Sequence, residues 1–416
     1  MSLVLLALGS RGDVQPMAAL AGELTRRGGD ARVVATADFA DLVADHGALF
    51  VPIAADSRDA VALTHAPFAE HLFSTRVGQA LLLRRWVSDI ADPVAAAALA
   101  ATQSGDTILT GVLTRDLAIA LATGRGGRAV TVLHTGQLPT AHAESHFARD
   151  SFRGSARYNR GGSALSWRVT TSLGMRASAP ARAALDLPRG RSATATAEAD
   201  RSPVLIAASP LVVPPAPDWP ANAQQTGYLA GPATAYEPDP GLAHFLAAAE
   251  APVYVGFGSL GASGAFNDLS AVLDAARLSG RRIVAPAVGG APVGRASRLV
   301  YAIADVPHEW LFSRMAAVVH HGGAGTTWAG LRSGRPSAAV PFGVDQPYHG
   351  SRLHDLGVGP EPLAVQDLSA ISLARMITRL TTGEYDARAA EVGARARTED
   401  GLGETISALE ALGCLA

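Results

Sequence analysis

Lysine is absent from this sequence, and all 35 basic residues among its 416 are arginine. Chemistry that needs a lysine amine, such as Schiff-base formation or a lysine clamp on phosphate, is therefore excluded. Charge of both signs is scarce, since 17% of the residues are charged and the formal net charge is −2. At this balance no basic surface for nucleic acid or for an anionic membrane is expected.

Cysteine and long apolar runs are scarce as well. The single cysteine, Cys414, cannot form an intramolecular disulfide or a thiolate metal cluster. The first apolar run, residues 3–8, is short and has no basic leader, so it predicts a strand rather than a signal peptide. No run approaches the ~18 apolar residues that span a bilayer. We therefore expect a cytoplasmic protein without integral membrane association.

Short apolar runs alternate with helical patterns, which predicts parallel sheets covered by helices on both faces. The length and a hydrophobic content of 48% suffice for two or three domains with cores of their own. Strands are predicted at residues 4–8, 32–35, 108–113, 130–133, 204–208, 253–257, 283–287, 299–303, 317–319 and 338–340. The predicted helices include residues 14–27, 268–279 and 325–333.

A segment dense in proline and glycine, residues 209–241, separates the two halves of this pattern and is typical of an extended connection. We place an N-terminal domain at residues 1–213, a linker at 214–241 and a C-terminal domain at 242–416, with the option that the last helix packs back on the first domain. The fold class is therefore α/β, with two Rossmann-like parallel-sheet domains facing each other across a cleft. Ligands of open α/β sheets bind beyond the carboxyl ends of the strands, so both domains are expected to contribute to one site.

The stretch "HHGGAGTT" joins a predicted strand to a predicted helix. Its glycines allow backbone N–H groups to approach an anion, and the helix N-terminus adds partial positive charge. Thr326 and Thr327 offer hydroxyl groups at the same end, and His320 or His321 could donate from the strand side. The pattern predicts a phosphate or pyrophosphate site. The alternative is a tight turn whose threonines only cap the helix.

Two further turns follow predicted strands in the second half. In "PFGVDQPYHG", Asp345 accepts hydrogen bonds and Gln346 both donates and accepts, which suits adjacent sugar hydroxyl groups. The alternative is that Asp345 caps the helix that starts near Pro347. In "VYVGFGSLG", Ser259 and its neighbouring amides could reach a phosphate, or the stretch could be an ordinary turn at the end of a strand.

The N-terminal turn "LGSRGDVQP" stands where a dinucleotide site would need G-x-G-x-x-G, and that fingerprint is missing. A nicotinamide enzyme is therefore not expected. The turn offers Ser10, Arg11 and Asp13 to the cleft. Asp13 would be a general base if burial raised its pKa from ~3.9 towards neutrality, or else the N-cap of the helix that follows.

His134 ends another N-terminal strand, where it either contacts a second substrate or is a buried structural histidine. No Asp-x-Asp pair and no Cys/His cluster with zinc spacing occurs in the sequence, so no metal site is expected. The charge of a bound diphosphate would then be met by amides, a helix terminus, histidine and arginine.

The motifs "GSRGDVQP", "VPHEWLF", "HHGGAGTT" and "PFGVDQPY" occur here in the order seen in family 1 glycosyltransferases of the GT-B fold. The sequence resembles the branch of sterol glucosyltransferases and of bacterial enzymes that glycosylate antibiotic aglycones, including the vancomycin group. The resemblance covers essentially the whole chain. It implies an inverting, metal-independent transfer from a nucleoside diphosphate sugar to a hydrophobic acceptor, with the acceptor on the N-terminal domain and the donor on the C-terminal domain.

The resemblance also implies roles for single residues. Asp13 would be the base, Val306 would meet the nucleobase through main-chain groups, and Asp345 with Gln346 would hold sugar hydroxyls. The remaining donor-binding residues implied are Ser10, Arg11, Ser259, His321, Gly323, Ala324, Gly325 and Thr326.

The sequence departs from the family at three places. Plant members carry a Trp-x-Pro-Gln platform for the nucleobase and a histidine base, where this chain has Val306-Pro307-His308 and Asp13. Stacking of the base on a tryptophan is therefore not implied. His349 stands where sterol-type relatives have an aromatic residue.

The function expected from the sequence is transfer of a sugar from a dTDP- or UDP-sugar to a natural-product aglycone of secondary metabolism, by a monomer or homodimer without cofactor. An acceptor pocket lined by His65, Phe68, Phe73, Trp86 and His134 would suit a polyketide, macrolide, aromatic or sterol-like aglycone. Two alternatives stay open, namely a sugar-nucleotide epimerase on the same fold and a non-catalytic protein that binds a sugar nucleotide or glycolipid.

Overall fold

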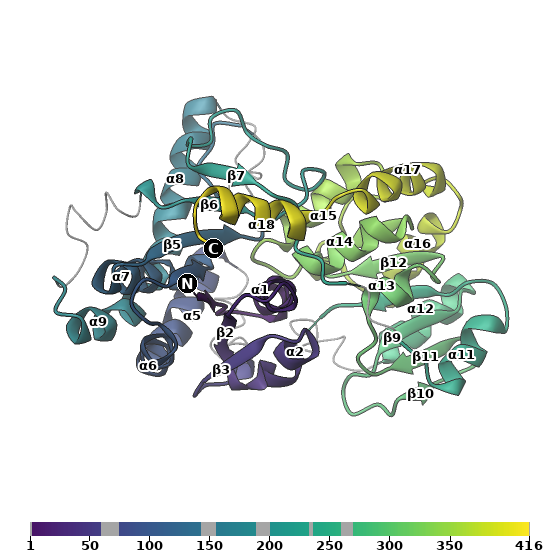
Figure 1. Ribbon diagram of the computed structural model, residues 1–416. Helices are drawn as coiled ribbons and strands as arrows, with labels where there is room; N and C mark the ends of the chain where they lie inside the picture. The colour runs from purple at the N-terminus through teal and green to yellow at the C-terminus, as the bar shows by residue number, and fades with distance from the viewer. Residues whose placement is uncertain are drawn as a thin grey trace. The chain divides into compact units, whose positions relative to one another are not determined.

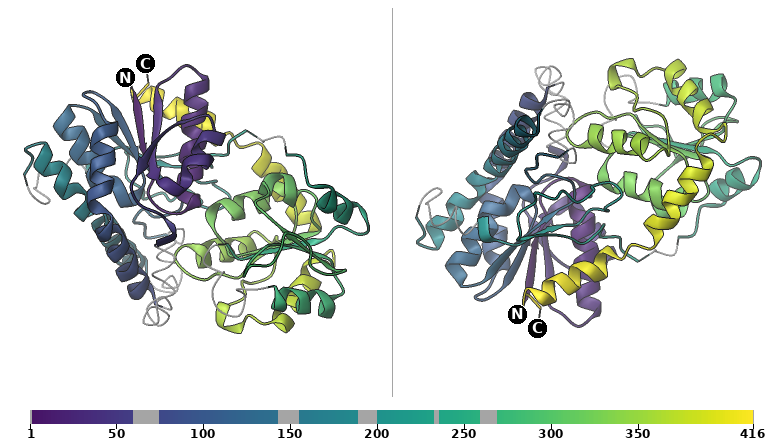
Figure 2. Two further views of the ribbon diagram at one scale, coloured as in Figure 1. Left: turned by 90° about the horizontal axis from the view of Figure 1, so that it is seen from below. Right: turned by 90° about the horizontal axis from the view of Figure 1, so that it is seen from above.

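The computed structural model describes residues 2–59, 75–142, 155–188, 200–232, 236–258 and 269–415. The chain divides into two compact units. Unit 1 comprises Met1–Pro232 and Asp400–Ala416, and unit 2 comprises Ala233–Glu399. Each unit contains one twisted sheet with helices on both of its faces (Figures 1 and 2).

The sheet of unit 1 has seven strands in the order β3-β2-β1-β4-β5-β6-β7, and its neighbouring strands are parallel. The strands are β1 (Leu3–Leu6), β2 (Ala31–Thr36), β3 (Leu49–Ile53), β4 (Thr107–Thr110), β5 (Arg128–Leu133), β6 (Val204–Ile206) and β7 (Ala223–Gln225). The helices and short 3-10 turns of unit 1 are α1 (Arg11–Arg26), η1 (Ala37–Phe39), α2 (Ala40–Asp45), α5 (Arg76–Asp89), α6 (Ala91–Ala101), η2 (Val112–Thr114), α7 (Arg115–Arg125), α8 (Ala156–Leu173), α9 (Met175–Ala184) and α18 (Gly401–Ala411).

The central strand β1 is a continuous apolar run because both faces of the sheet are covered there. In β1, Leu3 and Leu5 pack with α1 and α18 on one face. Val4 and Leu6 pack with α6, α7 and α9 on the other face. Successive side chains of a strand point to opposite faces, so a strand in this position must be apolar throughout.

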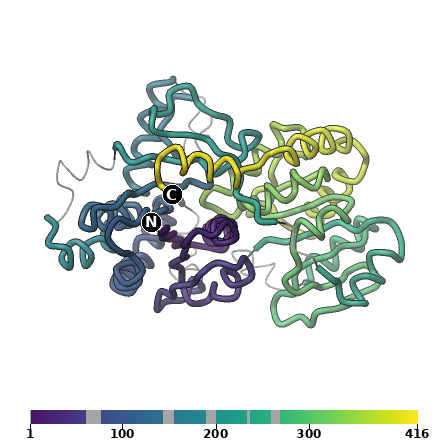
Figure 3. Tube along the Cα trace, in the orientation of Figure 1, coloured from purple at the N-terminus to yellow at the C-terminus, as the bar shows by residue number. Residues whose placement is uncertain are grey.

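The last helix, α18, belongs to unit 1 although it follows all of unit 2 in the sequence (Figure 3). Ile406, Leu409 and Cys414 lie in the same core cluster as Leu3 and Met17. The last helix is thus part of the compact unit that β1 begins, and unit 2 ends at Glu399.

The sheet of unit 2 has six strands in the order β10-β11-β9-β8-β12-β13. The strands are β8 (Val253–Gly256), β9 (Ile283–Pro286), β10 (Gly294–Arg295), β11 (Val300–Ile303), β12 (Ala317–His320) and β13 (Ser337–Ala339). The short edge strand β10 pairs antiparallel with β11, and the other pairings are parallel.

The helices of unit 2 are α11 (Pro240–Ala247), α12 (Ser270–Ser279), α13 (His308–Phe312), α14 (Ala324–Ser333), α15 (Gln346–Asp355), α16 (Ala370–Leu380) and α17 (Asp386–Arg397), with a 3-10 turn η6 (Val365–Asp367). Helices α12 and α16 cover one face of the sheet, where they bury Val253 and Val255. Helices α11, α13 and α14 cover the other face, where Tyr254 and Val318 are buried.

Both sheets have a point at which the strand order reverses. In unit 1 it lies between β1 and β4, and in unit 2 between β8 and β12. The connections that leave these strands run to opposite faces, which opens a crevice at their carboxyl ends where ligands of such sheets bind. The turns after β1 and β12 carry the "GSRGD" and "HHGGAGTT" motifs, so both motifs lie at switch points.

Each predicted strand corresponds to a strand of the structure, with ends that differ by at most three residues. The predicted strand 108–113 ends at Thr110, because residues 112–114 form a 3-10 turn. Strands β3, β7 and β10 were not predicted, since β7 and β10 are very short and β3 carries a proline. β7 lies within the predicted linker and pairs with β6, so that part of the segment is folded sheet. Among the described residues, no helix is long and apolar enough to cross a membrane.

Candidate functional site

The turn between β12 and α14 forms the first part of the site, and we call its residues 322–326 the phosphate loop. Helix α14 begins at Ala324, and its N-cap residue, Gly323, has no side chain with which to cap the helix. The N–H groups of a first helical turn have no carbonyl partners within the helix. Because the helix dipole adds partial positive charge there, the loop is suited to bind an anion such as a diphosphate.

The threonines of the motif lie inside the helix rather than at its cap. Thr326 and Thr327 occupy its third and fourth positions, and both are buried. The alternative in which these side chains merely cap the helix therefore does not describe this turn. Thr326 lines the pocket described below.

At two positions of the phosphate loop, neighbouring atoms leave no room for a Cβ atom, so glycine is needed there. Gly322 has φ +87°, and a Cβ atom on it would lie 2.7 Å from the carbonyl oxygen of Gln346. A Cβ atom on Gly323 would lie 2.5 Å from Nε2 of His321. Nδ1 of His320 accepts a hydrogen bond of 3.0 Å from the N–H of Gly322, which holds the turn from the strand side.

Both histidines of the motif are neutral at physiological pH. Burial lowers the pKa of His321 to about 4, although the nearby carboxylate of Asp345 acts in the opposite direction. Burial also lowers the pKa of His320 well below its usual value. Positive charge for an anion therefore comes from the helix terminus and not from these rings, while His321 can still offer one N–H group.

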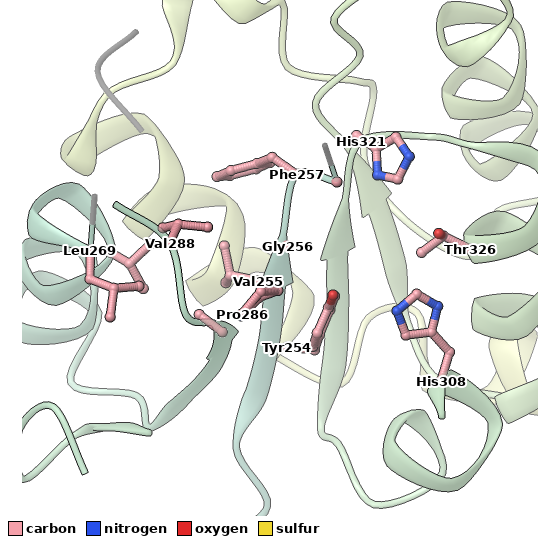
Figure 4. A pocket seen from close by; sticks show the side chains of 13 residues that line it. Tyr254, Val255, Gly256, Phe257, Leu269, Pro286, Val288, His308, His321 and Thr326 are labelled. Carbon is pink, nitrogen blue, oxygen red and sulfur yellow. The ribbon is translucent and has the colours of Figure 1, made fainter. Parts of the chain in front are cut away.

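A pocket of about 190 Å³ lies beside the phosphate loop in unit 2 (Figure 4). It is formed by the carboxyl ends of β8 and β9 together with α13 and the start of α14, and it is mainly apolar. Its lining residues are Tyr254, Val255, Gly256, Phe257, Gly258, Leu269, Val272, Ala285, Pro286, Val288, His308, His321 and Thr326. A largely apolar pocket beside an anion site fits a flat ring linked to a diphosphate.

Aromatic packing shapes one wall of this pocket. The ring of His308 stacks on Phe312 with centroids 4.6 Å apart, and the ring of Tyr254 lies 5.8 Å from His308. Burial raises the pKa of Tyr254, so its hydroxyl stays protonated. The Tyr254 hydroxyl lies directly over Gly256, where a Cβ atom would collide with it. The side chain of Val306 is part of the core, so its predicted main-chain contact with a nucleobase stays a prediction.

The turn between β13 and α15 forms the second part of the site, and we call residues 342–346 the sugar loop. Asp345 occupies the N-cap position of α15, yet its carboxylate caps none of the described helix residues. Capping therefore does not account for Asp345. Val344 has φ +56°, an unusual conformation for a β-branched residue, and its side chain is 58% exposed. Strain of this kind is typical of functional loops.

Gln346 has a structural role in addition to the predicted contact with sugar. Its side-chain oxygen accepts hydrogen bonds from the N–H groups of Phe342 at 2.8 Å and Gly343 at 3.3 Å. The residue is 5% exposed. Since this oxygen holds the loop together, a bound sugar would have to use the amide nitrogen of Gln346.

The turn between β1 and α1 forms the corresponding feature of unit 1. Helix α1 begins at Arg11, three residues earlier than predicted, and Ser10 is its N-cap. Asp13 occupies the third helical position, where Oδ2 accepts hydrogen bonds of 2.8 Å from the Ser10 N–H and 3.1 Å from the Ser10 hydroxyl. The Ser10 hydroxyl in turn accepts from the N–H of Gly12 at 3.2 Å. Asp13 is thus part of a capping box and not the N-cap itself.

Gly9 makes the position of Asp13 possible. It has φ +148°, and a Cβ atom on it would collide with Oδ2 of Asp13. The carboxylate is therefore held against the backbone at the end of β1, and it is only partly buried. The neighbouring Arg11 points its guanidinium to Gln15, with Nε 3.1 Å from Oε1. Hydrogen bonds from the N–H and the hydroxyl of Ser10 thus hold Oδ2 of Asp13 in place at this turn.

Among the predicted acceptor residues, Trp86 does not line an open pocket. It lies in α5 with 3% of its surface exposed and packs in the core with Val4 and Leu113. The prediction for Trp86 is therefore wrong, because α5 turns this residue towards the sheet. His65, Phe68, Phe73 and Ser259 lie outside the described residues.

We expect Trp86→Ala to lower the free energy of unfolding by about 3–5 kcal/mol, because it opens a cavity in this core. Trp167→Ala is a control within the same unit, since Trp167 is only partly buried and its loss should cost less. Thermal and denaturant unfolding followed by circular dichroism would measure both. A stable Trp86→Ala protein with altered substrate preference would instead restore the acceptor role.

His134 follows β5 at the carboxyl edge of the sheet of unit 1. Both of its ring nitrogens are buried and have no hydrogen-bond partner among the described residues. Burial lowers the pKa of His134 to about 4. The ring is therefore neutral near pH 7, and its nitrogens could take up a substrate group or could remain unsatisfied.

We expect His134→Phe to stabilise unit 1 by about 1–3 kcal/mol near pH 7, because two unsatisfied polar atoms are removed. The gain should grow as the pH falls from 6.5 towards 4, since the unfolded histidine is protonated in this range and the folded one is not. Unfolding curves at pH 7 and pH 5 would measure the difference. Equal stability of the variant and the wild type at both pH values would contradict the burial of a neutral ring.

Two family comparisons each match part of the chain. Residues 3–103 match the N-terminal domain of glycosyltransferase family 28. Residues 273–412 match the C-terminal domain of the erythromycin biosynthesis protein CIII-like family. The sterol 3-beta-glucosyltransferase of Pichia angusta is 30% identical over 440 residues, which include 97% of this chain and 33% of that protein. The chain thus spans about a third of the length of the curated relatives it matches.

Solved structures show the same fold over the whole chain. The glycosyltransferase of kitacinnamycin has a TM-score of 0.68 at 17% identity, covering 99% of this chain and 98% of that chain. The glycosyltransferase VinC in complex with dTDP has a TM-score of 0.62 at 21% identity, covering 99% of both chains. The chain therefore matches two glycosyltransferase-related family models in part and has the GT-B fold of these solved structures.

Sequence reasoning assigned no role to three residues that the structure places at the site. Tyr254 and His308 form one wall of the pocket, and His349 contacts the phosphate loop. Proximity to the motifs was the available signal, because His308 follows Val306 by two residues and His349 lies in the first turn after Asp345. Which of these side chains turn towards the site depends on helix and strand orientation, which the motifs do not specify.

Proposed function

We propose that this chain is an inverting, metal-independent glycosyltransferase that moves a sugar from a dTDP- or UDP-sugar to a hydrophobic natural-product aglycone. The observation that carries the proposal is the uncapped start of α14 beside the apolar pocket at the switch point of the second sheet. An anion site next to a ring-sized pocket corresponds to the diphosphate and the base of one nucleoside diphosphate. The partial matches to glycosyltransferase families support the same donor class.

The donor would be held by unit 2. The pocket lined by Tyr254 and His308 would take the nucleobase side of the donor. The N–H groups of Ala324, Gly325 and Thr326 would bind the diphosphate, and Asp345 would accept hydrogen bonds from hydroxyl groups of the sugar. Binding of dTDP by the structural neighbour VinC supports this donor class.

Metal independence is proposed because the chain offers another source of positive charge. The N-terminus of α14 is part of the phosphate loop, and no side chain of the described residues caps it. The sequence has no Asp-x-Asp pair, and within the described ranges no three His, Cys, Asp or Glu side chains are placed to hold a metal ion. Amide donors that are fixed before the reaction can stabilise a leaving diphosphate as its charge develops.

Asp13 would act on the acceptor. Its ionised carboxylate takes the proton from the acceptor hydroxyl as the acceptor oxygen attacks the anomeric carbon. The bond between that oxygen and the anomeric carbon forms while the bond from the carbon to the β-phosphate oxygen breaks. The nucleoside diphosphate leaves with the electron pair, and attack from the opposite face inverts the anomeric configuration.

The acceptor class is proposed from the relatives. The named relatives act on sterols, and the structural neighbours include glycosyltransferases of kitacinnamycin and calicheamicin. Sterols are large, mostly apolar molecules. We therefore propose an aglycone of secondary metabolism as the acceptor, and a cytoplasmic location where nucleotide sugars are available.

The proposal is tested by incubating the protein with dTDP-glucose or UDP-glucose and a panel of sterol, macrolide and aromatic aglycones, with and without EDTA. Mass spectrometry should detect a glycosylated aglycone and free nucleoside diphosphate, with no loss of rate in EDTA. An isomerised sugar nucleotide without transfer would favour an epimerase. Tight nucleotide binding without transfer or donor hydrolysis across the panel would favour a non-catalytic protein.

A further inference from the structure

His349 lies in the first turn of α15 and joins the two loops of the donor site. Its side chain is 1% exposed, and Nδ1 lies 2.9 Å from the carbonyl oxygen of Gly322 in the phosphate loop. A carbonyl oxygen can only accept a hydrogen bond, so Nδ1 must carry the hydrogen. The interaction is therefore a donated hydrogen bond from α15 to the phosphate loop.

The same nitrogen lies 3.8 Å from Oδ2 of Asp345. That distance is too long for a hydrogen bond. The negative carboxylate nevertheless favours the tautomer with a hydrogen on Nδ1, and this is the tautomer that can donate to the Gly322 carbonyl. The backbone makes a second approach between the loops, because Gly322 packs against the carbonyl of Gln346 with no room for a Cβ atom. His349 thus provides a directional bond across an interface that is otherwise formed by backbone packing.

Each loop is also held by bonds of its own. The phosphate loop is fixed by the hydrogen bond from the Gly322 N–H to His320. The sugar loop is fixed by the Gln346 side chain, which accepts from Phe342 and Gly343. Loss of the His349 bond should therefore leave both loops folded and change mainly the position of one loop relative to the other.

We infer that His349 is a positioning residue that sets the sugar-binding carboxylate of Asp345 against the phosphate loop. This inference rests on the proposed function. Of the two loops, a nucleoside diphosphate contacts only the phosphate loop, whereas a sugar nucleotide must satisfy both loops in one geometry. Removing the bond should therefore affect transfer much more than it affects binding of the nucleoside diphosphate.

The test compares variants that differ in one donor atom. In His349→Phe the ring is kept and the donor is lost. In His349→Asn the side-chain nitrogen is separated from Cα by the same number of bonds as Nδ1, so the donor is kept. His354→Phe is a matched control on the same helix, since His354 lies in its last turn and its side chain is 45% exposed.

Isothermal titration with dTDP and with UDP would measure binding, and steady-state assays with the sugar nucleotides would give kcat and KM. For His349→Phe we expect affinity for the nucleoside diphosphate within about threefold of wild type and kcat/KM lower by about 10–100-fold, because small misplacements of a reacting group are costly. His349→Asn should recover most of kcat/KM, and His354→Phe should match the wild type.

Wild-type kcat/KM in His349→Phe would overturn the inference, as would an Asn variant no better than the Phe variant. Equal losses of nucleoside diphosphate binding and of transfer would also overturn it, because they would indicate general structural damage. If His349→Phe does not fold, the comparison is made between His349→Asn and His349→Leu with the same expected order. A wild-type protein that binds neither dTDP nor UDP would overturn the proposed function itself, and this inference with it.

Discussion

Asp13→Asn should abolish most sugar transfer while the protein stays folded and still binds nucleoside diphosphate. A general base contributes about 10²–10⁴-fold to a rate, and an amide cannot accept the acceptor proton. This substitution separates the role of base from that of capping partner, because the asparagine oxygen can still accept hydrogen bonds from the N–H and hydroxyl of Ser10, as the carboxylate does. The capping box should survive, so the loss should fall on chemistry and not on the fold.

The measurement is the initial rate of glycoside formation by mass spectrometry, with dTDP and UDP affinities from titration and thermal unfolding as controls. Asp13→Ala serves as a second variant, in which both the base and the capping partner are lost. It should be as inactive as Asp13→Asn and less stable by about 0.5–2 kcal/mol. Transfer by Asp13→Asn near the wild-type rate would show that Asp13 is only a capping residue.

Gly322→Ala should weaken donor binding by at least about tenfold. The new Cβ atom would lie 2.7 Å from the Gln346 carbonyl oxygen, and φ +87° disfavours any side chain. The phosphate loop and the sugar loop would have to move apart, so the amides of α14 and the carboxylate of Asp345 could not both keep their positions. The strain of the left-handed conformation alone is about 1–2 kcal/mol.

Gly280→Ala is the matched control for this variant. Gly280 ends α12 with φ +67°, and a Cβ atom on it would meet nothing within 4 Å. Both variants carry the backbone strain, but only Gly322→Ala has the steric conflict. Titration with dTDP-glucose and UDP-glucose should show unchanged affinity for Gly280→Ala. If both variants bind these sugar nucleotides as the wild type does, the close packing of the two loops is not needed for donor binding.

Much of the fold could be predicted from the sequence because buried parallel strands leave a clear pattern. β1, with Leu3 and Leu5 on one face and Val4 and Leu6 on the other, is apolar throughout since helices cover both sides. The glycines of "HHGGAGTT" similarly identify a turn where backbone must approach a ligand or another loop. Gly322 meets that expectation in an unforeseen way, through its contact with Gln346.

Side-chain roles were harder to predict because they depend on direction. In the sequence, an aromatic residue of a binding pocket cannot be told from one of the core, and α5 directs Trp86 into the core. Gln346 has the hydrogen-bonding groups that sugar recognition needs, yet its oxygen holds its own loop. For Asp13, the sequence offered a base and a helix cap as alternatives, and the capping contacts in the structure do not prevent the same carboxylate from acting as a base.

The sequence by itself determined two parallel-sheet units, the glycine-rich anion loop and the resemblance to GT-B glycosyltransferases, because these depend on local patterns of apolar residues and on short motifs. Only the tertiary structure decided that α18 completes unit 1, that Trp86 is core, and that His349 reaches Gly322 across two loops. Each of these depends on contacts between residues far apart in the chain. Such contacts are set by how helices pack on a sheet, and no local pattern in the sequence records them.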